Sequence, residues 1–178
     1  MPSIKFQEKI KEINSWNIVH ISPTISTQLP SRSQVMVSGT IDAVEFQAPL
    51  EPDGRFSHWL HIDKKMLESL GKKSGDSVTL SIEATKNKDW PEPDIPADVQ
   101  SGIVDNVETH DLWKRITPMS RWEWLRWIGS TTNPGTRAKR IVVSRSKLLN
   151  GLRRPCCFNR SMCCVPNVSK NGVLVNLK

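Results

Sequence analysis

The segment 120–141, SRWEWLRWIGSTTNPGTRAKRI, decides the fold of the second half of the chain. Three tryptophans lie within six of its residues, Trp122, Trp124 and Trp127, and a cluster of arginine and lysine follows. Ser120 is a typical N-cap residue, and Glu123 three positions later completes a capping box. At about 100° per residue, the apolar side chains cover more than half of the helix circumference, and only Glu123 and Arg126 form a polar strip. The pattern predicts a helix that is buried on most sides.

The glycine, asparagine and proline residues that follow predict a second helix. Gly129 ends the first helix, and Asn133 with Pro134 begins the next, because asparagine caps helices and proline suits the first helical position. This second helix is expected to run to about residue 149, with Gly151 just past its end. Its expected apolar arc consists of Ala138, Ile141, Val142, Leu148 and Leu149.

The basic residues of this second helix fall into two groups. Arg137 lies at the edge of the apolar arc and Arg145 inside it, so each needs a polar partner or must extend its charge into solvent. A structural role is expected for both, and Arg145 is expected to be mostly buried and bonded to an acid or to backbone carbonyls. The remaining cations, Lys139, Arg140 and Lys147, are expected to point into solvent.

The distribution of charge is more informative than its total of +7. Residues 1–111 contain 11 Lys and Arg against 17 Asp and Glu, whereas residues 112–160 contain 12 against a single acid, Glu123. A basic segment with interleaved aromatic residues is typical of nucleic-acid-binding proteins. An acidic protein is the other partner that such a surface suits. If a polyanion binds here, the expected contacts are Lys139, Arg140, Lys147, Arg153 and Arg154.

Membrane and targeting segments are not evident in the sequence. No apolar run approaches the roughly 18 residues of a membrane-spanning helix, and the N-terminus lacks the apolar core of a signal peptide. A cytoplasmic protein is therefore expected.

The four cysteines form two adjacent pairs, Cys156-Cys157 and Cys163-Cys164, within one short segment. Secreted proteins distribute their cysteines so that disulfides join distant segments, and zinc sites usually have C-x2-C spacing. The adjacent pairs therefore predict thiols, with no structural disulfide, no bound metal and no cofactor.

The first half of the chain is predicted to be β structure. Apolar and polar residues alternate, or β-forming residues gather, in six segments: 4–6, 16–21, 35–41, 44–50, 56–62 and 78–82. A short helix capped by Asp63 interrupts these segments, and Gly75 with Asp76 forms a tight turn before the last of them. Short antiparallel strands with one brief helix predict a closed or nearly closed barrel.

A change of composition separates the two halves. The segment 86–96, KNKDWPEPDIP, has three prolines and no periodicity, and it is expected to be a semi-rigid connector. Residues 98–116 are then expected to be helical, with a break near Asp105 and Asn106, and to lead into the tryptophan helix.

Both halves resemble one known arrangement of families. Residues 37–83, from VSGTIDAVEF to GDSVTLSIE, resemble a small β-barrel domain of unknown function that commonly precedes a YdeI/OmpD-associated (bacteriocin-protection) helical segment. The second half resembles that segment, from Pro96-Ala97-Asp98 through Trp127-Ile128 to TRAKRI at 136–141. The resemblance covers about residues 5–154. The chain departs from the usual pattern at 129–132 and in its cysteine-rich end.

The resemblance implies an α+β fold, with a small double-split barrel of the AbrB/MazE type followed by a helical segment. It implies a barrel domain at 1–90, the helical segment at 91–154 and a basic, cysteine-rich tail at 155–178. Gly75 and Asp76 are similar to the Gly-Asp turn of such barrels, and a structural role is expected for both. The family has no agreed catalytic residues.

Catalysis is not favoured by the residues themselves. The histidines are scattered, and none of the usual phosphate-loop, nucleophile-elbow, zinc-protease or dinucleotide motifs is present. The expected function is a non-catalytic binding module with a cleft between barrel and helices. Two alternatives remain: a nucleic-acid-binding protein that uses the basic half, which is the analogy offered by AbrB-type barrels, and a thiol-dependent redox protein.

Overall fold

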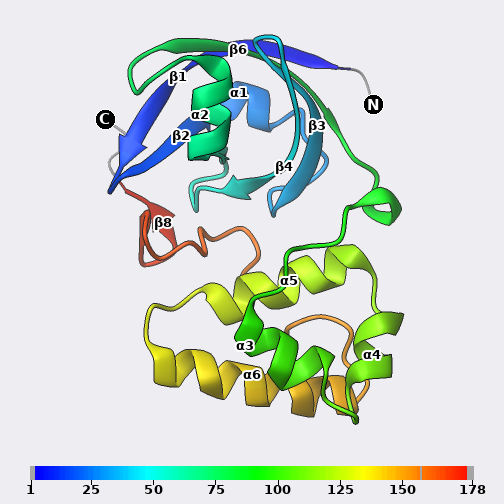
Figure 1. The fold of residues 1–178 in the computed structure, drawn as a ribbon. Coiled ribbons are helices and arrows are strands. Elements are labelled where there is room, and N and C mark those ends of the chain that lie inside the picture. The colour runs from blue at the N-terminus through cyan, green and yellow to red at the C-terminus, as the bar shows by residue number, and fades with distance from the viewer. Residues whose placement is uncertain (1–2, 157, 176–178) are drawn as a thin grey trace. The chain divides into compact units, whose positions relative to one another are not determined.

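The computed structural model describes residues 3–156 and 158–175, and the chain divides into two compact units (Figure 1). The barrel unit contains residues 3–86, 159–163 and 167–175. The helical unit contains residues 87–156, 158 and 164–166. The last part of the chain therefore contributes segments to both units, and each unit is described separately below.

Antiparallel strands close the barrel in the order β1-β2-β5-β4-β3-β6. The strands are β1 (Ile4–Ile13), β2 (Trp16–Ile21), β3 (Val35–Ile41), β4 (Val44–Pro52), β5 (His58–Ile62) and β6 (Ser77–Ala84). Closure depends on the pairing of the first strand with the last, in which Phe6 lies opposite Leu80. The predicted α+β class, with a small barrel ahead of helices, is confirmed, whereas the likeness to AbrB/MazE barrels stays a prediction.

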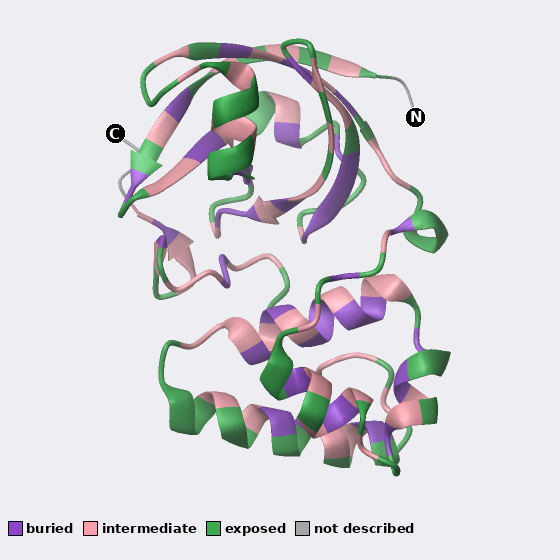
Figure 2. Cartoon of the chain, viewed as in Figure 1, coloured by how far each residue is buried: buried purple, intermediate pink, exposed green. Residues whose placement is uncertain are grey.

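Apolar side chains from all six barrel strands form one buried core, and the buried residues of these strands are purple in Figure 2. The buried core consists of Ile10, Val19, Ile21, Leu29, Val35, Val37, Ile41, Leu50, Leu60, Ile62, Val78, Leu80 and Ile82. Two short helices, α1 (Pro23–Ser26) and α2 (Lys64–Leu70), lie in the connections of the barrel unit. Met66 and Leu67 of α2 pack against the core.

The local signals read from the barrel sequence are confirmed. The carboxylate of Asp63 caps α2 by accepting a hydrogen bond from the Met66 backbone N–H at 2.8 Å. Gly75 adopts φ of +95°, which favours glycine, and the Asp76 carboxylate accepts a hydrogen bond from the Lys73 N–H at 2.9 Å. Gly75 and Asp76 thus lie in the turn that leads into β6, and the structural role expected for them stays a prediction.

The predicted start of the fifth strand at Phe56 is wrong. The strand begins at His58, and Phe56 has a left-handed backbone with φ of +72° and an exposed side chain. The cause is the buried Asp53 carboxylate, which accepts hydrogen bonds from the backbone N–H groups of Arg55 at 2.6 Å and Ser57 at 2.9 Å. These bonds fold residues 53–57 into a turn that alternation of residue types does not reveal.

The helical unit follows the predicted order of helices. It consists of η1 (Asn87–Asp89), α3 (Ala97–Val99), the π-helical turn η2 (Gln100–Val104), α4 (His110–Arg115), α5 (Pro118–Gly129) and α6 (Pro134–Leu149). The predicted break near Asp105 is confirmed, since α4 begins only at His110. In the described residues no helix is both long enough and apolar enough to span a lipid bilayer.

The core of the helical unit gathers around α5. Its buried apolar residues are Val99, Ile103, Trp113, Ile116, Trp124, Ile128, Ile141 and Leu148. The backbone of η2 lies close to α6, because a Cβ added to Gly102 would be 2.6 Å from Cγ2 of Ile141. The short separation between η2 and α6 determines which side of α6 is buried.

A hairpin near the end of the chain packs against the barrel. Strands β7 (Ser169–Lys170) and β8 (Val173–Leu174) are joined by Asn171 and Gly172, both with positive φ, as in a type I′ turn. The Leu174 N–H donates a hydrogen bond to the Asp53 carbonyl at 2.8 Å. A Cβ on Gly54 would lie 2.1 Å from the Gly172 carbonyl oxygen, so the hairpin and the turn at residues 53–57 are in close backbone contact.

Candidate binding surface on the helical unit

The N-terminus of α5 differs from the capping box predicted at Ser120. The helix begins at Pro118, and its N-cap is Thr117, whose hydroxyl accepts a hydrogen bond from the Ser120 N–H at 3.2 Å. Threonine is a good N-cap and proline suits the first helical position, so this start has the same physical basis as the predicted one. Ser120 therefore lies inside the helix, and Glu123 has no capping role.

The predicted polar strip of α5 is wrong, because Glu123 and Arg126 are buried. The Glu123 carboxylate pairs with the Arg154 guanidinium at 2.7 Å, and Arg126 donates to the sulfur of Cys164 at 3.6 Å. The guanidinium of Arg126 also lies 5.6 Å from the centre of the Phe158 ring. Residues from the end of the chain thus cover the side of α5 that the helical pattern assigns to solvent.

The orientation of α6 also differs from the prediction. Asn133 caps the helix by accepting from the Thr136 N–H at 2.8 Å, and the predicted end at Leu149 is confirmed. The inward side is narrow and consists of Ile141, Ser144 and Leu148. Ala138, Val142 and Leu149, which were predicted to lie in the apolar arc, are exposed instead. The close approach of η2 leaves room for only this narrow side of α6 in the core.

The prediction that Lys139, Arg140 and Lys147 of α6 point into solvent is only partly correct. Lys139 is exposed, as predicted. Arg140 is half-buried and donates to the Trp127 carbonyl at 2.7 Å and to the Ser130 hydroxyl at 2.6 Å, where α5 ends. Its guanidinium therefore adds hydrogen bonds at the end of α5, where the Trp127 carbonyl also accepts from the Ser130 N–H and from the Ser130 hydroxyl.

Lys147 is also engaged within the helical unit. Its ammonium donates to the sulfur of Cys156 at 2.9 Å and lies 5.2 Å from the centre of the Trp127 ring. Arg140 approaches the same ring at 5.5 Å. Trp127 thus receives two cation–π contacts that join α5 to α6, and the structural role expected for this tryptophan stays a prediction.

The two remaining members of the predicted polyanion set differ from each other. Arg154 pairs with buried Glu123, whereas the side chain of Arg153 is exposed. The structure thus leaves Lys139 and Arg153 exposed and commits Arg140, Lys147 and Arg154 to internal contacts. The binding role of the five residues stays a prediction.

Trp122 and Arg137 connect the helices to the segment that precedes them. The indole N–H of Trp122 donates to the Pro91 carbonyl at 2.9 Å. Arg137 binds both carboxylate oxygens of Asp98, with Nη2–Oδ1 at 2.9 Å and Nε–Oδ2 at 2.5 Å. These contacts fit the structural roles expected for Trp122 and Arg137.

The bidentate pair changes the titration of both of its groups. The hydrogen bonds from Arg137 lower the pKa of Asp98 against the opposing effect of burial, and the Asp98 carboxylate raises the pKa of Arg137. A lowered carboxyl pKa contributes stability above its unfolded value, and this contribution is lost as pH falls through the lowered pKa.

Arg145 was predicted to be bonded to an acid or to backbone carbonyls and to be mostly buried; the bond is confirmed and the burial is wrong. It is bonded to an acid, with its guanidinium 3.1 Å from Glu108, but its side chain is 34% exposed and that of Glu108 58%. Replacing Arg145 with alanine is expected to change the free energy of unfolding by only about 0–1 kcal/mol, since exposed pairs are screened by water. Urea unfolding of the variant, with Glu108→Ala and the double variant completing the cycle, measures this value. A loss of about 3 kcal/mol or more would show that the pair behaves as a buried one.

The cysteines occupy different surroundings. Cys156 is exposed beside Lys147, whereas Cys163 and Cys164 are buried. Cys157 lies outside the described residues. Among the described side chains, no three or more His, Cys, Asp or Glu gather as a metal site requires. The predictions about disulfide, metal and thiol chemistry all stay predictions.

The histidines hold structural contacts in separate places. His20 bonds to the Asp53 carboxylate at 3.1 Å, and the buried His58 donates from Nε2 to the Ser33 carbonyl at 2.9 Å. His61 stacks on Trp16, and His110 bonds to the Val104 carbonyl. His20, His58 and His61 lie on the paired strands β2 and β5, and each histidine contacts a different partner.

An exposed strip on α6 has the clearest binding character in the helical unit. Ala138, Val142 and Leu149 are exposed, and at about 100° per residue they lie on one side of the helix. Lys139 flanks this strip on one edge and Arg145 on the other. We call this set the outer strip of α6. The helical pattern alone assigned its apolar members to the core, so only the position of η2 reveals it.

Comparison with protein-family models divides the chain in the same way as the fold. Residues 5–82, which contain most of the barrel strands, match a domain of unknown function, DUF1905. Residues 92–151, which contain α3 to α6, match the family described as bacteriocin-protection, YdeI or OmpD-associated. The search among curated proteins found no match. The resemblance noted in the sequence is confirmed, since the two successive parts of the chain match the models of the DUF1905 family and of the YdeI/OmpD-associated bacteriocin-protection family.

Proposed function

We propose that this protein is a non-catalytic binding module that recognises an acidic partner protein through the outer strip of α6. The observation that carries the proposal is the exposure of large apolar side chains on a helix whose charged residues are all basic. Val142 is 62% exposed and Leu149 49% exposed. Burial of an exposed side chain of this kind in an interface contributes about 1.5–3 kcal/mol.

The neighbouring surface extends the apolar character of the strip. Arg145 contacts Glu108, and the residue before Glu108, Val107, is 91% exposed. The pair therefore brings an exposed valine of the segment before α4 toward the edge of the strip. Clustered exposed apolar residues on a small protein are typical of binding sites.

The charge of α6 indicates the chemistry of the partner. Within Pro134–Leu149 there is no acidic residue, and the basic residues are Arg137, Lys139, Arg140, Arg145 and Lys147. A partner segment with apolar residues on one side and carboxylates beside them would match both features. Complementary charge of this kind raises association rates and excludes wrong partners.

A protein partner is favoured over a nucleic acid by the use of the cations. Nucleic-acid affinity depends on many free Lys and Arg that neutralise phosphates. In the helical unit Arg140, Lys147 and Arg154 contact groups of the protein itself. The apolar side chains of the outer strip form neither hydrogen bonds nor ion pairs with phosphates. The nucleic-acid alternative, the thiol alternative, the cleft between barrel and helices and the cytoplasmic location stay predictions.

The test uses the isotope-labelled full chain and a synthetic amphipathic helical peptide with leucines on one side and glutamates beside them. We expect saturable chemical-shift changes at Ala138, Val142, Ser146 and Leu149. Val142→Glu should weaken binding about tenfold or more, since one lost apolar contact of about 1.4 kcal/mol already gives a factor of ten. Its melting temperature should remain close to that of the unchanged chain, because Val142 is exposed.

Val143→Glu is the matched control, because residue 143 lies on the same helix but about 100° away from the strip. It should leave the affinity for the peptide nearly unchanged. Tighter binding of a short DNA duplex than of the acidic peptide would contradict the proposal. Equal effects of the two valine variants, or self-association of the chain through α6 instead of peptide binding, would contradict it as well.

A further inference from the structure

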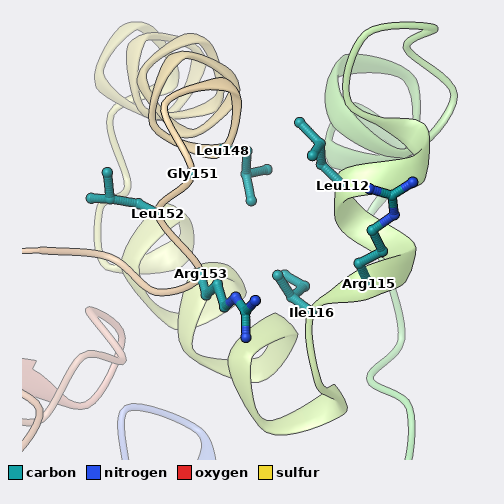
Figure 3. Close-up of a pocket in the computed structure, with 7 residues that line it drawn as sticks. All are labelled: Leu112, Arg115, Ile116, Leu148, Gly151, Leu152 and Arg153. Carbon is teal, nitrogen blue, oxygen red and sulfur yellow. The ribbon is translucent and has the colours of Figure 1, made fainter.

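A pocket of about 200 Å³ lies within the helical unit, between α4 and the end of α6 (Figure 3). It is lined by Leu112, Arg115, Ile116, Leu148, Gly151, Leu152 and Arg153. The outer strip of α6 shares none of these residues. The pocket therefore needs an explanation of its own.

The walls of the pocket are aliphatic. Leu112 from α4 and Leu148 from the last turn of α6 face each other across the opening, and Ile116 lies below them in the view of Figure 3. The turn after α6 adds Leu152. Gly151 has φ of +81°, and the Leu152 N–H donates to the Lys147 carbonyl at 3.0 Å, which ends the helix and returns the chain beside it.

Two arginines accompany this aliphatic wall, Arg115 at the end of α4 and Arg153 after α6. Both are exposed, and in the part of the chain that the structure describes neither side chain forms a hydrogen bond or an ion pair. Every other arginine side chain of the helical unit has a partner there: Arg121 with Glu92, Arg126 with Cys164, Arg137 with Asp98, Arg140 with the Trp127 carbonyl, Arg145 with Glu108 and Arg154 with Glu123. The two guanidinium groups that are left without a partner are therefore the two that line the pocket.

The backbone that carries each arginine is anchored by a buried side chain. The indole N–H of fully buried Trp124 donates to the Arg153 carbonyl at 3.2 Å. Arg121 donates to the carbonyls of Trp113 at 3.1 Å and Lys114 at 2.9 Å, which holds the end of α4 where Arg115 lies. The backbone that carries each cation is thus held in place before any ligand arrives, and this reduces part of the ordering cost of binding.

We propose that this pocket binds a small carboxylic acid with a short apolar body. A carboxylate accepts charge-assisted hydrogen bonds from a guanidinium group, and Arg115 and Arg153 each offer such a group at the edge of the pocket. The leucines and Ile116 provide the surface for the apolar body. The volume is below the roughly 300–1,000 Å³ of pockets for drug-sized ligands, so the ligand must be small. An inorganic anion would leave the aliphatic wall unused, and a neutral apolar molecule would leave both charges without a partner.

The test uses hexanoate with the isotope-labelled full chain. We expect saturable chemical-shift changes at Leu112, Ile116, Leu148 and Leu152. Hexanol, which lacks the charge, should bind at least about tenfold more weakly, since a hydrogen bond to a charged group is worth about that factor. Acetate, which lacks the apolar body, should also bind at least about tenfold more weakly, because each buried CH2 group contributes about 0.8 kcal/mol. Inorganic phosphate serves as the further anion control.

Arg153→Gln and Arg115→Gln should each weaken hexanoate binding about tenfold, as one charged hydrogen bond predicts. Lys114→Gln is the matched control, because it removes an exposed cation next to Arg115 that does not line the pocket. Leu152→Glu places a like charge against the carboxylate and should abolish binding. Each variant is compared only if its melting temperature and circular dichroism match those of the unchanged chain, and the exposure of both arginines makes this the expected outcome.

Equal affinity for hexanol and hexanoate would overturn the proposal, as would unchanged binding in both arginine variants or shift changes outside the pocket. Tighter binding of phosphate than of hexanoate would overturn it too. The result is separate from the proposed function, since Val142→Glu removes the outer strip and leaves every pocket residue in place.

Discussion

Replacing Trp124 with alanine is expected to lower the free energy of unfolding of the helical unit by about 3–5 kcal/mol, the range for large aromatic residues in a core. Trp124 is fully buried at the centre of a cluster that includes Ile103, Ile128 and Leu148. The substitution removes the ring and leaves a cavity that the surrounding helices fill only in part. It also removes the hydrogen bond from the indole N–H to the Arg153 carbonyl. Urea unfolding followed by far-ultraviolet circular dichroism measures the loss.

Trp122→Ala is the matched control for this change. Trp122 is a half-buried tryptophan of the same helix, bonded to the Pro91 carbonyl, so its removal should cost clearly less than that of Trp124. Amide hydrogen exchange should show that the Trp124 variant loses protection in α4, α5 and α6 before the barrel strands do. A variant with the stability of the unchanged chain would contradict the central position assigned to Trp124.

Replacing Gly39 with alanine is expected to lower the free energy of unfolding of the barrel by at least about 1–3 kcal/mol. This is the usual cost of overpacking a well-packed interior. A Cβ at this position would lie 1.9 Å from the Ser81 carbonyl oxygen and 2.9 Å from Cα of Ile82. Both atoms belong to the backbone of β6, which pairs with β3 at this point, Gly39 opposite Ile82. Backbone atoms cannot move aside as a flexible side chain does, so the two strands must separate locally.

Thermal unfolding followed by the circular dichroism of the β strands measures the effect of Gly39→Ala. Ser38→Ala is the control, because residue 38 is an exposed neighbour on β3, and a surface substitution of this kind changes stability by about 0.5 kcal/mol or less. Unchanged melting of the Gly39 variant would show that β3 and β6 are farther apart than the structure has them.

Features that depend on neighbouring residues were predictable from the sequence. The cap at Asp63, the cap at Asn133 and the end of α6 near Gly151 follow from hydrogen bonds and backbone angles that a few adjacent residues determine. Alternation of residue types likewise identified the strands of the barrel. The wrong prediction of the start of α5 shows the limit of such patterns. Thr117 and Ser120 are only three residues apart and both are good N-cap residues, so the local sequence does not decide between them.

The candidate sites depend on segments far apart in the sequence, and they could not be predicted. Glu123 and Arg126 form a polar strip in any helical projection of α5, but Arg154 and Cys164 from the end of the chain bury them. Arg140 is a surface cation by its position on α6, yet the end of α5 supplies its partners.

What the sequence by itself determined is the order of the barrel strands, of α2 and of the main helices of the second half, because local hydrogen bonding, turn chemistry and hydrophobic periodicity act over a few residues; it did not predict α1 or the hairpin of β7 and β8. The tertiary structure alone decided which side of α6 is covered, since Gly102 lets η2 approach Ile141 closely and leaves Val142 and Leu149 exposed. It also decided that Arg115 and Arg153, which have no partner among the described residues, lie beside one aliphatic pocket. The physical reason is that periodicity identifies an apolar side of a helix, whereas its burial depends on the space left by segments that the chain brings back from elsewhere.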